Sequence, residues 1–211
     1  MTTLQKTSYA IQQAFKSVGM TVSRGKIQEI IASGFGYGSL AAYQASPEED
    51  PGIDAADYVL LDTAAMKSRA AALGVTPFPV IEIIPIFNKT AAPIVAVSSF
   101  EDFADEIRPD VMTKILIEDG RVASAIAETN ADNGDIDPEF EEPVDSVADA
   151  QDFWEVPVSG QVQLDQDPEK PFSGDAINID GVVRFTKVGR RCVRHMELDI
   201  SAAVDDSYYV G

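Results

Sequence analysis

Hydrophobic residues in the first 46 positions recur at the 3.6-residue period of an amphipathic helix. The repeating positions are Ile11, Ala14, Phe15 and Val18, followed by Ile27, Ile30, Ile31 and Gly34. Gly19 follows the first segment, where a helix C-terminus favours glycine, and Ser23 precedes the second as an N-cap. Ser39 is placed to cap a third, shorter helix. The pattern therefore predicts a helical unit over residues 1–46.

Residues 54–97 combine helical and strand-like patterns. Residues 54–73 are Ala-rich and carry an apolar stripe at helical spacing, which predicts one long, half-buried helix that ends before Gly74. Two runs of apolar and β-branched residues, 80–87 and 94–97, are separated by a polar Asn-Lys-Thr sequence. Such runs are typical of strands. We therefore predict a β-hairpin over residues 80–97.

A helix start signal and the strongest hairpin signal in the chain follow. Residues 98–101, Ser-Ser-Phe-Glu, form a capping-box sequence, which predicts a short helix that ends at Arg108-Pro109. Residues 113–118 and 121–126 are apolar runs on either side of Asp119-Gly120, a pair typical of two-residue hairpin turns. Residues 54–128 are therefore expected to form a small sheet with two helices.

The C-terminal part of the chain favours β structure. Strand-like runs cover residues 156–158, 162–164, 176–179, 182–185 and 192–200, with Asp180-Gly181 as a second tight turn. The predicted fold class is α+β, with an N-terminal helical unit, a central small α+β sheet unit and a C-terminal antiparallel β-rich unit over residues 153–211.

Acidic residues are concentrated in one part of the chain. The 211 residues have a formal net charge of −19, and fourteen Asp and Glu with no Lys, Arg or His lie within residues 122–169. A run of this kind repels anions, attracts cations or covers a basic surface. Residues 129–152 are predicted to be a solvated acidic loop or linker. Its interaction surface comprises Asp132, Asp135, Asp137, Glu139, Glu141 and Glu142.

Asp132, Asp135 and Asp137 are the weak candidates for a calcium site. Together with Gly134 they imitate the centre of an EF-hand loop. The register fails, because Thr129 and Phe140 would then occupy the first and twelfth positions, where carboxylates are needed. A solvated loop is therefore the preferred interpretation, and no metal or cofactor is expected.

Basic residues gather immediately downstream. A hairpin of residues 182–188 and 191–198 would bring together the bases of this segment. They are Arg184, Lys187, Arg190, Arg191 and Arg194. Three interpretations are open: the cluster binds an external anion such as phosphate or RNA, the acidic segment of the same chain covers it, or the bases are scattered over the surface. The second is favoured, because tethering gives the acidic segment a high effective concentration.

Composition excludes several activities. The single Cys192 and the single His195 leave no internal disulfide and no multi-cysteine or His-based zinc site. No phosphate-binding loop, dinucleotide-binding fingerprint or nucleophile elbow occurs. No apolar run approaches the roughly 18 residues that span a bilayer. We expect a cytoplasmic protein that is not an enzyme.

Three short motifs in the N-terminal unit resemble a known module. They are Gly19-x-x-Val22-Ser23, then residues 27–32 (Ile-Gln-Glu-Ile-Ile-Ala), then Gly36-Tyr37-Gly38-Ser39-Leu40-x-x-Tyr43. The pattern is similar to the small helical module of bacterial proteins labelled glyoxalase-related. The resemblance covers about the first 46 residues, with Leu40 in place of the usual aromatic residue. It implies no glyoxalase activity, because that chemistry needs a metal held by His and Glu ligands.

The helical unit has two interpretations, namely a packing or oligomerisation element and a helix-turn-helix. The segment 39–45 offers almost no Arg, Lys or Asn to contact bases, and phosphate repels a chain of charge −19. Nucleic acid is therefore not expected as a partner.

Three functional hypotheses follow. The first is a bacterial accessory protein that binds a partner with a basic surface. Under this hypothesis the protein can originate from a mobile element, and it can also form a homo-oligomer. The second is an acidic mimic of nucleic acid. The third is an anion or RNA binder that uses residues 184–194.

Overall fold

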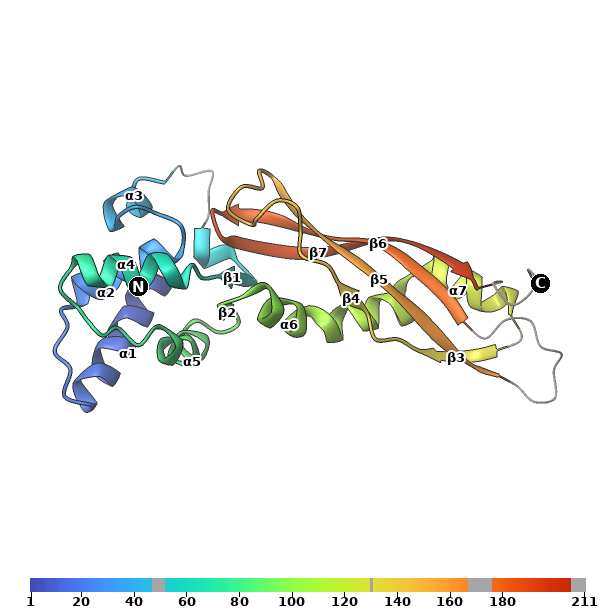
Figure 1. The fold of residues 1–211 in the computed structure, drawn as a ribbon, viewed down its shortest axis with the longest axis horizontal. Helices are drawn as coiled ribbons and strands as arrows, with labels where there is room; N and C mark the ends of the chain where they lie inside the picture. Colours follow the sequence, from blue (N-terminus) through green and yellow to red (C-terminus); the bar gives the residue numbers. More distant parts are fainter. Residues whose placement is uncertain (47–51, 130, 167–175, 206–211) are drawn as a thin grey trace. The chain divides into compact units, whose positions relative to one another are not determined.

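Helices occupy the N-terminal half of the chain and long strands the C-terminal part, which confirms the predicted α+β class (Figure 1). The structure is a computed structural model that describes residues 1–46, 52–129, 131–166 and 176–205. The helices are α1 (Thr3–Ser17), α2 (Arg24–Gly34), α3 (Leu40–Gln44), α4 (Thr63–Ala72), α5 (Val80–Ala91), α6 (Phe100–Thr113) and α7 (Gly120–Glu128), with a 3-10 turn η1 (Gly52–Ala55) and a π-helical turn η2 (Lys114–Glu118).

The strands form one mixed sheet. They are β1 (Tyr58–Leu60), β2 (Val95–Val97), β3 (Ala131–Asp135), β4 (Glu139–Phe140), β5 (Phe153–Gln166), β6 (Ala176–Gly189) and β7 (Cys192–Val204). Their order is β2-β1-β7-β6-β5-β3, and β4 pairs with β5. The pair β1 and β2 is parallel, whereas β1 runs antiparallel to β7.

The chain folds into two compact units that are both assembled from separate segments. The first unit contains Met1–Phe103, Asp145–Trp154 and Thr186–His195. The second contains Ala104–Val144, Glu155–Phe185 and Met196–Gly211. Strands β5, β6 and β7 therefore contribute residues to both units. The division into residues 1–46, 54–128, 129–152 and 153–211 stays a prediction.

In the first unit, the predicted N-terminal helices and caps are confirmed. The hydroxyls of Ser23 and Ser39 accept hydrogen bonds from the backbone N–H groups that begin α2 and α3. Gly19 follows α1 with φ of +82°, a conformation that favours glycine. Helix α1 packs against α2 and α5, and α2 packs against α4. Val18 lies outside this core, since 72% of the residue's surface is exposed.

The predicted hairpin over residues 80–97 is wrong, because its first run is helix α5. The buried positions Val80, Ile83, Phe87 and Ala91 follow the helical period. Only residues 95–97 form a strand, which pairs with β1. The Asn88 side chain accepts a hydrogen bond from Ala96 N and donates one to Ala96 O, so it covers the free edge of β2.

The single long helix predicted for residues 54–73 is divided into β1 and α4. Val59, Leu60 and Leu61 are all buried. Three consecutive residues of a surface helix point in different directions, so they could not all be buried by one face of the helix. They lie in or beside a central strand instead. The Asp62 carboxylate then caps α4 by accepting a hydrogen bond from Ala65 N at 2.9 Å.

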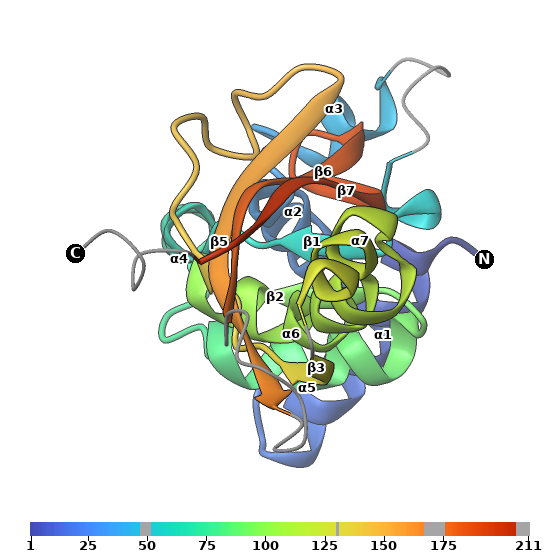
Figure 2. The same cartoon turned by 90° about the vertical axis from the view of Figure 1, so that its right-hand side faces the viewer.

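In the second unit, the hairpin predicted around Asp119-Gly120 is also wrong. Helix α6 continues past Pro109 to Thr113, and Ile107, Val111 and Ile115 are buried at intervals of four residues. Asp119 is the N-cap of α7 and accepts a hydrogen bond from Arg121 N. The sheet is curved, and helices α6 and α7 lie on its concave side (Figure 2).

Strand β6 runs without a break through Asp180-Gly181, so the second predicted Asp-Gly turn is wrong as well. A Cβ atom at Gly181 would lie 2.2 Å from the carbonyl oxygen of Asp199 on β7. The glycine therefore permits close approach of two backbones. In the first unit, the predicted hairpin of β6 and β7 is confirmed, with Arg190 and Arg191 in its turn.

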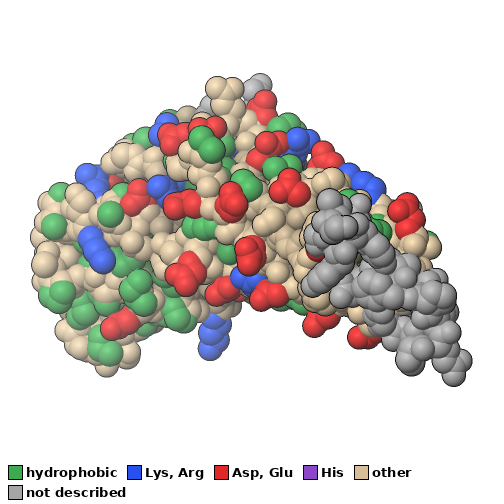
Figure 3. All heavy atoms as spheres, turned by 45° about the vertical axis from the view of Figure 1, so that its right-hand side comes forward, with side chains coloured by type: hydrophobic (Ala, Val, Ile, Leu, Met, Phe, Trp, Pro, Cys, Tyr) green, Lys and Arg blue, Asp and Glu red, His purple; other side chains and the backbone are tan. Residues whose placement is uncertain are grey.

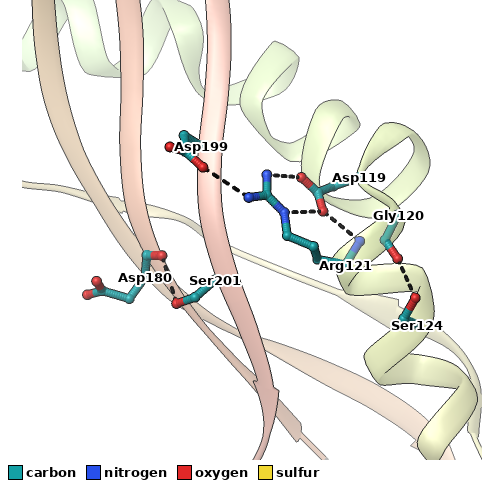
Figure 4. A network of polar contacts seen from close by, with 7 residues as sticks. All are labelled: Asp119, Gly120, Arg121, Ser124, Asp180, Asp199 and Ser201. Carbon is teal, nitrogen blue, oxygen red and sulfur yellow. Dashed lines mark hydrogen bonds and ion pairs between the residues drawn. The ribbon is translucent and has the colours of Figure 1, made fainter.

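Asp119 also anchors an ionic network in the second unit (Figure 4). Arg121 donates to Asp119 at 2.8 Å and to Asp199 on β7 at 3.0 Å. The Arg121 guanidinium holds the pKa of Asp119 below its usual range. The network ties the start of α7 to the sheet.

An Asp119→Ala variant is expected to lose about 1 kcal/mol of unfolding free energy at pH 7, because it removes the cap and the ion pair. A carboxyl with a depressed pKa stabilises the folded state at pH values above its unfolded pKa, and this contribution disappears as the pH falls through the folded pKa. The difference from wild type should therefore shrink below about pH 4. Urea unfolding across pH measures this difference, and Asp119→Asn, which keeps a capping oxygen, should lose less.

Candidate functional site

The first part of the acidic segment predicted as a loop, residues 131–141, is an extended edge of the sheet, whereas residues 142–152 contain no regular helix or strand. Asp135 lies opposite Gln163, and Glu139 lies opposite Ser159, in one antiparallel register with β5. Glu141 N donates to Pro157 O at 3.1 Å, which continues that register. Residues 135–141 therefore follow β5 as one extended segment, although only its two ends are regular strand.

Side chains along this segment alternate between solvent and core. The acidic residues Asp135, Asp137, Glu139 and Glu141 are exposed, whereas the intervening Ile136 and Pro138 are buried and Phe140 is half-buried. Residues two apart in a strand lie about 6.6–6.8 Å from each other on the same face. We call Asp135, Asp137, Glu139 and Glu141 the carboxylate row.

Arg108 from α6 fixes the middle of this segment. Its Nη1 donates to Asp137 at 2.6 Å and also to the carbonyl oxygen of Pro138. The guanidinium carbon lies 5.3 Å from the centre of the Phe140 ring, within cation–π range. Asp137 nevertheless keeps 86% of its side-chain surface exposed, so it remains accessible to a partner.

Charge separates sharply between the two units. The described residues of the second unit include eighteen Asp and Glu and four Lys and Arg, a formal charge of −14. Those of the first unit include ten acids and eleven bases, a charge of +1. On the face drawn in Figure 3, carboxylate groups outnumber ammonium and guanidinium groups. The acidic character of the chain therefore belongs to the second unit.

All four described bases of the second unit form ion pairs within that unit. Arg108 and Arg121 have the partners given above, Lys114 contacts Glu118 at 3.2 Å, and Arg184 contacts Glu155 at 2.6 Å. The bases are thus engaged while most of the carboxylates remain exposed to solvent. This arrangement produces a strongly negative local potential.

The remaining predicted acidic residues are placed differently. Glu142 is exposed just beyond the carboxylate row, and the side chain of Asp132 lies outside the described residues. Asp135 Oδ1 accepts a hydrogen bond from Ile136 N, whereas Asp137 contacts Arg108. In the described part of the chain, no group of three or more His, Cys, Asp or Glu side chains is placed to hold a metal ion.

The predicted basic cluster is distributed over both units. Arg184 belongs to the second unit and pairs with Glu155. In the first unit, Lys187 Nζ donates to the carbonyl oxygens of Val147 and Ala150, the latter at 3.0 Å. The base-free stretch of residues 122–169 therefore contacts the cluster through Glu155 and through backbone carbonyls.

The turn of the β6–β7 hairpin packs against the helical part of the first unit. Arg190 lies over the Tyr37 ring, 5.1 Å from its centre, and donates to Gly36 O at 3.2 Å. Arg191 contacts the Asp62 carboxylate at 3.2 Å. Arg194 Nε is buried and has no hydrogen-bond partner among the described residues. The hairpin turn therefore serves as a packing element of this unit.

Sequence reasoning missed a pocket of about 420 Å³ beside this hairpin turn. Its lining includes Ser33 and Tyr37 from the end of α2 and the loop that follows. Helix α4 contributes Ser68 and Arg69, and its N-cap residue Asp62 also lines the pocket. Asp62 was detectable as a polar residue before a helical run, but the pocket combines segments distant in sequence and left no local signal.

Comparisons with known proteins give no match: no protein-family model, no curated protein and no solved structure is significantly similar to this chain. The resemblance of residues 1–46 to the glyoxalase-related module therefore stays a prediction. None of the described helices is long and apolar enough to cross a membrane.

Proposed function

We propose that this chain is a non-enzymatic interaction protein that binds a partner with a basic surface through the carboxylate row. One observation carries the proposal: four exposed carboxylates lie in a single β register at the edge of a unit whose described residues have a charge of −14. Side chains on a paired strand lose less conformational freedom on binding than those of a solvated loop, which favours affinity.

The row favours a partner that presents several Lys or Arg side chains at regular spacing. The steering field of the whole second unit would accelerate the encounter and make it sensitive to salt. Arg184, Lys187, Arg190 and Arg191 are engaged within the protein, so binding of an external anion or RNA by residues 184–194 is a weaker proposal.

A second candidate function is mimicry of nucleic acid. The row places a negative charge about every 6.6–6.8 Å along an extended backbone. Successive phosphates along one nucleic-acid strand have a comparable separation. The partner would then be a nucleic-acid-binding protein, and duplex DNA would displace this chain from it.

The test compares two variants that each remove four carboxylate charges from the second unit. The first neutralises the row (Asp135→Asn, Asp137→Asn, Glu139→Gln and Glu141→Gln). The control neutralises the exposed residues Glu106, Asp110, Asp180 and Glu197 in the same way. Fluorescence anisotropy with labelled decalysine at low salt should show about tenfold weaker binding for the first variant and at most about threefold for the control.

Equal losses in the two variants would mean that the unit attracts cations only through its net charge, and the row would then have no special role. Circular dichroism should confirm that both variants keep the fold. Retention of the decalysine affinity by the row variant would overturn the proposal.

A further inference from the structure

The pocket in the first unit lies between the loop after α2 and one face of α4. Asp62, Ala65 and Arg69 are three and four residues apart, so they share a helix face. The side chains between the two charged groups are small, which leaves about 420 Å³ of open space. A volume of this size is within the range of small-molecule sites.

The two charged groups differ in how far their hydrogen-bonding capacity is used. Each oxygen of Asp62 already accepts a hydrogen bond, Oδ1 from Ala65 N at 2.9 Å and Oδ2 from Arg191 at 3.2 Å. Arg69 donates from Nη2 to Glu29 at 2.6 Å, and it makes no further side-chain hydrogen bond to the described residues. The unused capacity at this pocket therefore belongs to a donor.

Arg69 Nε is buried and has no acceptor in the described part of the chain. A buried donor without an acceptor costs about 1–3 kcal/mol. A small rotation of the Arg69 side chain that brings Nε to an acceptor on a ligand is therefore favoured. A guanidinium presents parallel N–H groups that match the two oxygens of a carboxylate. Arg69 is thus suited to receive an anionic group at the pocket.

The charges around the pocket set the charge of the ligand. Three positive charges lie near the pocket, on Arg69, Arg190 and Arg191, and two negative charges, on Glu29 and Asp62. The net formal charge is therefore +1. A dianion would be repelled by the two carboxylates. Tyr37, Ala65 and Ala72 provide apolar walls. We propose that this pocket binds a small organic monocarboxylate, with its carboxylate on Arg69 and its apolar body against Tyr37 and the alanines.

Gly36 in the loop after α2 is adapted to this arrangement. It adopts φ of +86°, and a Cβ atom there would lie 3.4 Å from Arg190 Cβ. The glycine therefore allows the hairpin turn to approach the loop and to hold Tyr37 beneath Arg190. The pocket wall depends on this contact.

Ligand-detected NMR on the full chain with hexanoate, benzoate and benzamide tests the proposal. The two carboxylates should bind saturably and compete with each other, whereas the neutral benzamide should bind at least about tenfold more weakly because it cannot form a charge-assisted pair. Sulfate, which is a dianion at neutral pH, should not compete.

Two variants of the pocket and one matched control locate the site. Arg69→Gln should weaken benzoate binding about tenfold or more, and Ala65→Leu should abolish it by filling the space above α4. Arg24→Gln is the control, because Arg24 hydrogen-bonds to Gln5 O and Ser8 Oγ, away from the pocket. It should bind benzoate as wild type does.

Ala65→Leu keeps the Arg69–Glu29 pair, so it answers the question even if Arg69→Gln unfolds. The absence of saturable binding of both carboxylates overturns the proposal, and so does equal binding of benzamide. Unchanged benzoate affinity in Ala65→Leu would place the carboxylate elsewhere on the protein and overturn it too. None of these outcomes depends on the carboxylate row.

Discussion

A Gly181→Ala variant is expected to lose about 3 kcal/mol of unfolding free energy, as for other overpacked or strained positions. The added Cβ would lie 2.2 Å from the carbonyl oxygen of Asp199 and 2.6 Å from the Cα of Ile200. Both neighbours are backbone atoms of β7, so no side-chain rotation can relieve the overlap. The two strands would have to separate where the sheet of the second unit is continuous.

Urea unfolding of Gly181→Ala beside Gly25→Ala measures this effect. Gly25 lies in α2, and a Cβ atom there would have no heavy atom within 4 Å. Gly25→Ala should stabilise the protein by about 0.5–1 kcal/mol, because alanine has the higher helix propensity. Similar stabilities of the two variants would show that β6 and β7 are not in close backbone contact at Gly181.

Gly181 also shows why local turn signals misled the sequence prediction. The chain contains two Asp-Gly pairs between apolar runs, at residues 119–120 and 180–181, and neither is a hairpin turn. At the first, the aspartate caps a helix, a role for which it is equally suited. At the second, the glycine makes room for a neighbouring strand. The partner that decides between these roles is distant in sequence.

Helix α5, for which a strand is predicted, has a helical signal that is visible in its own sequence. Residues 80–91 are rich in isoleucine, which favours a strand by composition, and they contain Pro85, which is unfavourable inside a helix. Their buried positions nevertheless follow the helical period. The period would therefore have been a better guide than residue type. The N-terminal helices were predictable because their period and caps agree.

The carboxylate row was present in the sequence as a strict alternation of acidic and apolar or proline residues from 135 to 141. The number of acids obscured this two-residue period, and the segment was assigned to a loop. The pocket at Arg69 could not be predicted, because two segments distant in sequence form it and neither one alone indicates a binding site. Periodicity along one segment is visible in a sequence, whereas the convergence of several segments is not.

Replacement of Lys187 by methionine is expected to lower the unfolding free energy by about 2–3 kcal/mol, since hydrogen bonds to charged groups are worth more than neutral ones. Lys187 Nζ donates to the carbonyl oxygens of Val147, Ala150 and Arg190, the last two at 3.0 Å. Methionine retains the apolar stem but leaves these acceptors without the ammonium group. The segment Asp145–Trp154 would lose the two side-chain hydrogen bonds from Lys187, while the backbone bond from Lys187 N to Asp152 O remains.

Lys67→Met is the matched control, because Lys67 is exposed on α4 and its loss should change stability by less than about 0.5 kcal/mol.

The salt dependence of stability distinguishes two ways in which the acidic stretch can be attached to the hairpin. Surface carboxylates that cover a basic cluster would be screened by 0.5 M NaCl, whereas short hydrogen bonds to carbonyl groups would be little affected. If the stability difference between wild type and Lys187→Met persists at high salt, the acidic stretch is held to the hairpin by its backbone. Its exposed carboxylates are then available to a partner.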